Sequence, residues 1–246
     1  MLTVASTAGS VYTIVMTRGI VIAGNESALI NAIEIEAAKR EGQYALALIR
    51  NRFSGWNEKP RRESPPEVSA AVSQIPQENT CIGLDWNPGS PVSTRTLVLA
   101  VENRLGRIDQ AILVCNPPSA PCAATDLGLA DVEVLVNDHI KGWFFLIKEL
   151  AAIFRTRGEG SLALVYPEHA SSKVIDFLRP AALAAFRSLT AGLLTAAAGE
   201  HLTLGFAGGD TGDEAGYAAF IFKQIDEGNR RANGKLFKYG KLGIFR

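Results

Sequence analysis

Two groups of side chains that could transfer protons in catalysis lie beside apolar stretches of the sequence. Tyr166, Glu168 and His169 follow the apolar stretch SLALVY, and His139 precedes the apolar stretch IKGWFFLIKEL. Tyrosine, histidine and carboxylate groups act as general acids or bases when they lie within hydrogen-bond reach of a substrate. Polar residues are also common at strand ends and helix starts for purely structural reasons. We favour the structural interpretation at both places and keep catalysis as the alternative.

A group of basic residues could bind phosphate. It lies in or beside the polar, proline-rich stretch 51–66 and consists of Arg50, Arg52, Lys59, Arg61 and Arg62. Arginine and lysine side chains bind phosphates of cofactors such as a 2′-phosphorylated dinucleotide or coenzyme A. Because Glu58, Glu63 and Glu67 balance the charge, we favour a solvated loop.

Composition indicates a soluble globular protein. Of 246 residues, 47% are hydrophobic and 20% are charged, and the formal net charge is zero. A neutral chain has no overall field that would attract nucleic acid or an anionic membrane, and no apolar run is long enough to span a bilayer. The first fifteen residues carry no basic residue typical of a signal peptide.

The cysteines indicate a reducing compartment. Cys81, Cys115 and Cys122 are too few and too scattered for a disulfide framework or a zinc site. We therefore predict no metal and a cytoplasmic location. No base stands beside Cys115 in the sequence, so we interpret it as a small buried residue and not as a nucleophile.

Apolar runs alternate with stretches of helical periodicity. Strands are predicted at 19–24, 44–49, 81–86, 111–115, 161–166, 202–207 and 234–240. Helices are predicted at 28–41, 67–75, 92–105, 131–157, 180–198 and 215–225. This alternation predicts an α/β fold with a Rossmann-like, doubly wound parallel sheet and helices on both faces.

One domain accounts for most of the chain. Residues 19–246 form the predicted Rossmann domain, and residues 1–18 form an N-terminal extension of uncertain structure. The extension is an added edge strand, a disordered arm or a misassigned start, and the residues do not distinguish these alternatives.

Several segments resemble the short-chain dehydrogenase/reductase family over about residues 19–240. They are RLGRIDQAILVCNPP, DHIKGWFFLIKELAAIFRTRGEGSLALV, AALAAFRSLTAGLLTAAAGEHLTLGFAGG and EAGYAAFIF with NGKLFKYG. The resemblance implies the same fold, an NAD cofactor on a glycine-rich turn, and catalysis by serine, tyrosine and lysine.

The glycine-rich turn departs from the family pattern. The matching stretch is AGNESALI, in which Gly24 is kept while Ala28 and Ile30 replace the two later glycines. Glycines let the backbone approach a pyrophosphate at a helix N-terminus. We expect Ile30 to block or tilt a cofactor and Glu26 to repel its phosphates. Weak cofactor-binding candidates remain in Arg50 and Asp85.

The positions of the family's catalytic serine, tyrosine and lysine carry no proton donor here. The serine position falls at Pro167, the tyrosine at Phe177 and the lysine at Ala181, while the asparagine of the proton relay falls at His139. The family also folds a long segment over its substrate, and here only DTGD separates Gly209 from Glu214. We predict no catalytic residues and no bound cofactor in this chain.

The apolar helices around 139–157 and 180–198 remain. In the family they pack against a neighbouring subunit. We predict an interface formed by residues on these helices and the C-terminal tail: Trp143, Phe144, Ile147, Leu150, Phe186, Leu189, Leu193 and Phe245. The expected partner is a catalytic short-chain dehydrogenase paralogue that carries NAD, in a hetero-oligomer expected to be a tetramer.

The resulting hypothesis is a non-catalytic subunit of an NAD-dependent alcohol dehydrogenase, with a CoA-thioester alcohol as the substrate of the assembly. Two alternatives stay open. One is a divergent active NAD(P)-dependent reductase that uses His139 or the Tyr166–His169 group. The other is a regulatory protein that binds a small ligand on the same fold.

Overall fold

A computed structural model of the chain describes residues 2–5, 11–14, 18–40, 42–49, 81–119, 123–168, 176–196, 201–208, 212–228 and 230–240. Its centre is a seven-stranded sheet in which all neighbouring strands are parallel. The strand order is β5-β4-β3-β6-β7-β8-β9. The predicted Rossmann-like parallel sheet is thereby confirmed.

The strands match the predicted apolar runs closely. They are β3 (Arg18–Asn25), β4 (Gly42–Ile49), β5 (Cys81–Leu84), β6 (Gln110–Val114), β7 (Ser161–Pro167), β8 (Leu202–Gly208) and β9 (Leu236–Tyr239). Every residue of β6 is buried, which is expected for a strand covered by helices on both faces.

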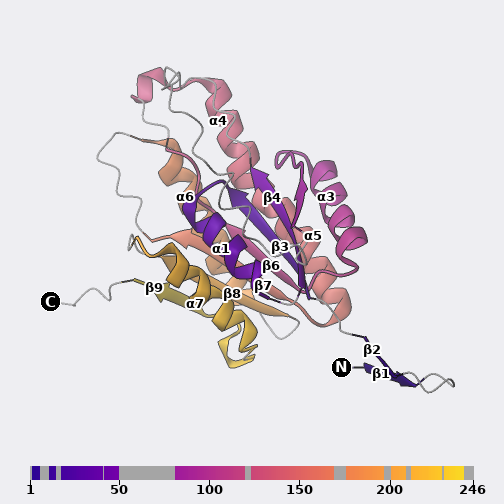
Figure 1. Cartoon of the computed structure of the whole chain (residues 1–246). Helices are drawn as coiled ribbons and strands as arrows, with labels where there is room; N and C mark the ends of the chain where they lie inside the picture. The colour runs from indigo at the N-terminus through magenta and orange to yellow at the C-terminus, as the bar shows by residue number, and fades with distance from the viewer. Residues whose placement is uncertain are drawn as a thin grey trace, which may run out of the picture.

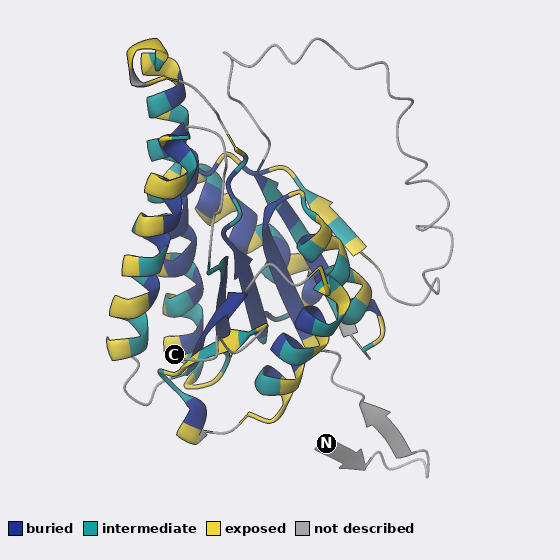
Figure 2. Cartoon of the chain, turned by 90° about the vertical axis from the view of Figure 1, so that its left-hand side faces the viewer, coloured by how far each residue is buried: buried dark blue, intermediate teal, exposed yellow. Residues whose placement is uncertain are grey.

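Helices cover the two faces of the sheet (Figure 1). On one face α1 (Ala28–Ala38) packs beside α7 (Glu214–Asp226). On the other face lie α3 (Pro91–Leu105), α5 (Gly142–Arg157) and α6 (Leu178–Ala196). The buried side of each helix is turned toward the strands, and its exposed side faces outward (Figure 2).

The predicted long helix 131–157 is interrupted. It consists of α4 (Leu129–Val136), a π-helical turn at Asn137–Lys141 and α5. At the start of α5, a Cβ atom on Gly142 would lie 2.5 Å from the Cβ of Pro88, so only glycine allows this approach. Two short 3-10 helices are also present, η1 (Ala124–Asp126) and η3 (Arg230–Ala232).

The N-terminal residues form a small sheet of their own. Strand β1 (Leu2–Ala5) pairs antiparallel with β2 (Val11–Ile14), and neither belongs to the seven-stranded sheet. The structure therefore does not show the first alternative for residues 1–18, an added strand at the edge of the main sheet. The predicted helix at 67–75 lies outside the described residues.

Trp143 lies at the centre of the core on the α5 side. Its ring meets Trp86 and Phe186 edge-on, with ring centroids 6.1 and 5.2 Å apart. Its side chain is completely buried, whereas the neighbouring Phe144 is 52% exposed. Two adjacent aromatic residues on one helix therefore have opposite environments.

This contrast gives a matched test of the core. Trp143→Ala should lower the free energy of unfolding by about 3–5 kcal/mol, because it removes a large side chain and leaves a cavity. Phe144→Ala should change it by less than about 0.5 kcal/mol, as is usual for exposed positions. Urea titration followed by circular dichroism measures both, and equal losses would contradict the packing described for α5.

Candidate functional site

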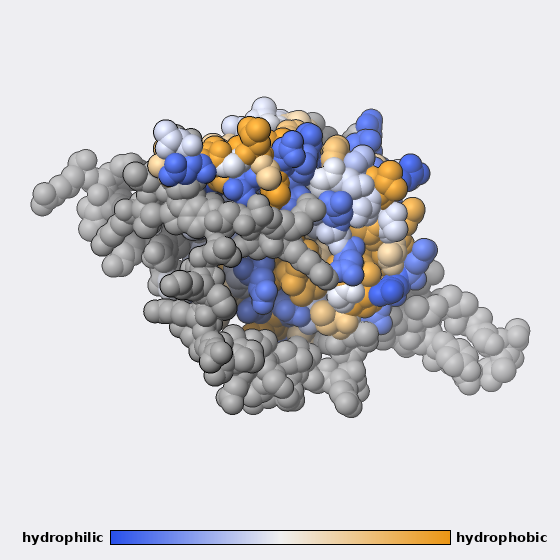
Figure 3. Space-filling model, turned by 90° about the horizontal axis from the view of Figure 1, so that it is seen from above, coloured by the Kyte–Doolittle hydropathy of each residue, from blue (hydrophilic) through white to orange (hydrophobic). Residues whose placement is uncertain are grey.

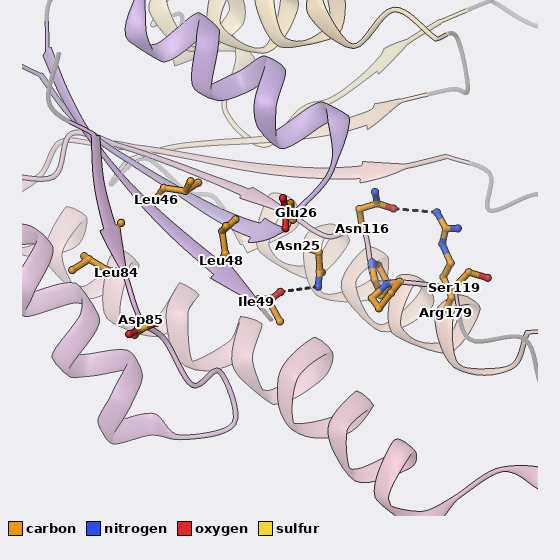
Figure 4. Close-up of a pocket in the computed structure, with 13 residues that line it drawn as sticks. Asn25, Glu26, Leu46, Leu48, Ile49, Leu84, Asp85, Asn116, Ser119 and Arg179 are labelled. Carbon is orange, nitrogen blue, oxygen red and sulfur yellow. Dashed lines mark hydrogen bonds between the residues drawn. The ribbon is translucent and has the colours of Figure 1, made fainter. Parts of the chain in front are cut away.

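A cleft of about 820 Å³ lies at the carboxyl ends of the central strands (Figure 4). It is lined from β3, β4 and β5 and from the segment after β6. The chain runs outward from β3 to β5 and then returns to the other side of β3 to form β6. Ligands of open α/β sheets bind where the strand order reverses in this way.

Asn25 and Glu26 form the part of the cleft nearest α1. Asn25 ends β3 and is 6% exposed, and its Nδ2 donates to the carbonyl oxygen of Ile49, 3.3 Å away. Its Oδ1 is buried and has no hydrogen-bond partner among the described residues. Glu26 is exposed, so its carboxylate is the acceptor that this wall presents to the cleft.

The side chain of Ser27 caps the start of α1. The Oγ of Ser27 accepts from the backbone N–H of Ile30, 3.3 Å away. One of the free N–H groups that make a helix N-terminus attractive to phosphate is therefore already used. The carboxylate of the exposed Glu26 lies beside this helix start, where it would repel a phosphate.

The expectation for Ile30 is corrected by the structure. Its side chain is 1% exposed and packs into the core under α1, so it does not enter the cleft. A Cβ atom on Gly24 would lie 3.0 Å from Ile30 Cδ1 and 2.6 Å from the carbonyl oxygen of Val114. Gly24 therefore serves close packing, and Ala28 is an exposed residue at the first position of α1.

The opposite wall of the cleft carries a cation. Arg179 in the first turn of α6 lines the cleft, and its Nη2 donates to Asn116 Oδ1, 3.0 Å away. Asp176 caps this helix by accepting from the backbone N–H of Arg179, 3.1 Å away, and it also accepts from Ser119. The buried Nε of Arg179 has no partner among the described residues.

The sequence places Pro167, Phe177 and Ala181 at the positions of the family's catalytic serine, tyrosine and lysine. None of these three side chains can donate a proton. Pro167 ends β7, and its carbonyl oxygen accepts from Arg187 Nη2, 2.8 Å away. Phe177 is 47% exposed just before α6, and Ala181 is exposed on that helix. Arg187 thus occupies the strand end at which the serine position falls.

His139 does not reach the cleft. It is 2% exposed within the π-helical turn and is absent from the cleft lining. Its burial agrees with the structural interpretation favoured from the sequence.

The Tyr166 group is engaged in local contacts. Tyr166 is 7% exposed, and the Arg187 guanidinium lies 5.5 Å from its ring centroid. Burial raises the pKa of Tyr166, while the Arg187 charge lowers it. Glu168 forms an ion pair with Lys238, and Tyr166 does not line the cleft. His169 lies outside the described residues.

The connection between β8 and α7 is short, as predicted. Strand β8 ends at Gly208 and α7 begins at Glu214. Asp213 holds this connection: its Oδ1 accepts from the backbone N–H of Gly216 at 2.9 Å and its Oδ2 accepts from the Tyr239 hydroxyl at 2.7 Å. The hydrogen bond from Tyr239 lowers the pKa of Asp213.

Four of the residues predicted to form an interface are not on the surface of this chain. Trp143, Ile147, Leu150 and Phe186 are buried in this chain's own core, because the apolar stripes of α5 and α6 face the sheet. Of the predicted interface residues that the structure describes, Phe144 is exposed and Leu189 and Leu193 are partly buried. Phe245 lies outside the described residues, as do Arg50 and the rest of the basic group.

Seen from above, hydrophilic and hydrophobic side chains are interspersed over the described part of that face (Figure 3). Among the described residues there is no group of three His, Cys, Asp or Glu placed to hold a metal ion. Within the same ranges no helix has both the length and the apolar character needed to cross a membrane.

Comparison with known proteins supports the fold. A short chain dehydrogenase from Mycobacterium smegmatis has a TM-score of 0.65 at 12% identity, covering 92% of this chain and 93% of that one. A putative oxidoreductase from Escherichia coli str. K-12 has a TM-score of 0.68 at 15% identity, covering 90% and 95%. An NADH-dependent reductase A1-R′ complexed with NAD has a TM-score of 0.68 at 12% identity, covering 90% and 94%. No family model and no curated protein matches the sequence. The chain therefore has the fold of short-chain dehydrogenases.

The cysteines allow a test of thiol chemistry. Burial raises the pKa of the Cys81 thiol to about 11, with Glu34 adding to the rise and Tyr44 opposing it. At pH 8 its alkylation by iodoacetamide should be roughly a hundredfold slower than that of a free thiol, because so little thiolate is present. Burial also raises the pKa of Cys115, which should react only on unfolding.

Peptide mapping by mass spectrometry measures the two rates separately. Glu34→Gln removes a negative neighbour of Cys81 and should accelerate its alkylation. Reaction of either native thiol as fast as a free thiol would contradict the environments described.

Proposed function

We propose that this chain is a non-catalytic subunit of a hetero-oligomeric short-chain alcohol dehydrogenase. The observation that carries the proposal is that the chain has a cleft at the carboxyl ends of its strands but lacks the side chains that catalysis and cofactor binding need there. Pro167, Phe177 and Ala181 supply no proton, and Glu26 places a negative charge where the family resemblance puts the pyrophosphate. General acid–base catalysis requires a titratable group within reach of the reacting oxygen.

In the proposed assembly the catalytic partner binds NAD and carries out hydride transfer. This chain supplies a folded surface to it and takes no part in the chemistry. The short β8–α7 connection supports this division of roles, because active sites of this kind exclude water with a covering segment.

The changed positions resemble those expected of the inactive subunit of 2-[hydroxy(phenyl)methyl]succinyl-CoA dehydrogenase, which belongs to benzylsuccinate β-oxidation in anaerobic toluene degradation. We propose on this resemblance that the assembly oxidises the alcohol of a CoA thioester. The proposal for the pathway rests on the whole set of changed positions and on no single motif.

Purification of the tagged chain from its native host tests the proposal. We expect a stoichiometric partner with an intact Tyr-x-x-x-Lys motif and NAD-dependent alcohol oxidation by the complex. Tyrosine to phenylalanine in the partner's motif should reduce turnover by about 10²- to 10⁴-fold, because it removes the general acid–base group. Tyr166→Phe in this chain should leave turnover unchanged.

The divergent-reductase alternative predicts the reverse. The isolated chain would then oxidise or reduce a nicotinamide cofactor, and Tyr166→Phe or His139→Ala would abolish that turnover. Either result would replace the subunit proposal with a catalytic one.

A further inference from the structure

The carboxyl end of β7 carries hydrogen-bond donors that lie outside the cleft described above. Tyr166 and Lys238 belong to one cross-strand row, because the register pairs Tyr166 with Ala207 and Ala207 with Lys238. Neighbours in such a row lie on the same face of a parallel sheet. The Tyr166 ring meets Phe186 of α6 edge-on, so this is the face that α6 covers. A phenol and an ammonium group are therefore placed on the α6 side of one strand end.

Arg187 brings a guanidinium from α6 to the same place. Its Nη2 donates to the carbonyl oxygen of Pro167, 2.8 Å away, and to that of Glu168. The guanidinium carbon lies 5.5 Å from the centre of the Tyr166 ring. These contacts fix the guanidinium beside the phenol without using its other terminal nitrogen, Nη1.

Two donors at this strand end are open to a ligand. The Nε of Arg187 is buried and out of reach. The Nη1 of Arg187 and the hydroxyl of Tyr166 are not among the buried atoms that lack a partner, and neither donates to a described residue. Burial raises the pKa of the Tyr166 phenol, so it stays protonated at neutral pH and can donate. With the guanidinium 5.5 Å from the ring centre, one carboxylate can reach both donors through hydrogen bonds of about 2.8 Å.

The local charge favours an anion. Lys238 forms an ion pair with Glu168, so these two charges offset each other. Arg187 has no ion-pair partner among the described residues, because its contacts are to carbonyl oxygens and an aromatic ring. One positive charge is therefore left over among these three residues. A guanidinium beside a phenol hydroxyl is a donor set that suits a carboxylate.

We propose that Tyr166, Arg187 and Lys238 bind a small carboxylate ligand at the carboxyl end of β7. The Tyr166 hydroxyl and Arg187 Nη1 donate to the ligand oxygens, and the Lys238 ammonium attracts them at longer range. Glu168 opposes binding, because its carboxylate holds Lys238 and repels the ligand. The inference goes beyond the proposed function, since these side chains require neither a catalytic partner nor a dinucleotide.

A purely structural role is the alternative for Arg187, because its Nη2 already joins α6 to the end of β7. That role depends on Nη2 and does not involve the Tyr166 hydroxyl. The two interpretations therefore differ in what happens when only the hydroxyl is removed.

Calorimetric titration of the full chain with butanoate, at constant ionic strength, tests the proposal. Butanamide keeps an acceptor oxygen but has no charge, and butylamine has the opposite charge. We expect saturable binding of butanoate and binding at least about tenfold weaker for both analogues, since hydrogen bonds to a charged group are the stronger ones.

Matched tyrosine variants separate binding from general damage. Tyr166→Phe keeps the ring and removes one donor, so it should weaken butanoate binding about tenfold. Tyr239→Phe is the control and should leave binding unchanged, because that hydroxyl donates to Asp213 on the α7 side. Glu168→Gln removes a negative charge and releases Lys238, so it should tighten binding.

Variants of Arg187 test the contribution of its charge. Arg187→Lys keeps the charge and should bind butanoate more tightly than Arg187→Gln. Because both changes also remove contacts with the end of β7, thermal unfolding followed by circular dichroism confirms that each variant is folded before it is titrated.

Three results would overturn the proposal. They are no saturable binding of butanoate, equal binding of butanamide and butanoate, and an unchanged affinity in Tyr166→Phe. These outcomes do not depend on an assembly, so the subunit proposal can fail or survive separately.

Discussion

The reversal of strand order between β3 and β6 creates the cleft on which the rest of the account depends. Parallel strands place their carboxyl ends on one edge, and the segments that leave β3 and β6 must diverge to opposite faces of the sheet. A hollow is thus a consequence of topology and survives changes of side chain. What the hollow can bind is decided by the few residues that follow the strand ends, here Asn25, Glu26, Asn116 and Arg179.

Packing in the core explains how Gly24 and three aromatic residues maintain the fold. Gly24 remains because a Cβ atom would collide with the Val114 carbonyl, so its retention reports on the core and not on a cofactor. Trp143, Trp86 and Phe186 fill the space between α3, α5, α6 and the sheet with edge-on aromatic contacts. The packing of these residues does not involve a cofactor.

The sequence predicts the strands and helices well, because their periods of two and 3.6 residues are properties of short segments. The sequence does not show whether an apolar stripe faces the sheet or a partner, since both give the same period. For this reason the prediction of Trp143 and Phe186 as interface residues is wrong, and both are buried in the core. The direction of Ile30 and the hydrogen bond from Arg179 to Asn116, 63 residues apart in the sequence, depend on tertiary structure. Asn25 had a usable signal, because it directly follows a buried strand, but nothing in the sequence shows its unpaired oxygen.

The claim that this cleft rejects a dinucleotide is tested most directly by titrating the isolated chain with NADH and following the fluorescence of the nicotinamide. An intact short-chain dehydrogenase in the same buffer serves as the positive control. The account predicts no saturable change for this chain at NADH concentrations that saturate the control. Saturable binding with an affinity similar to that of the control would contradict it.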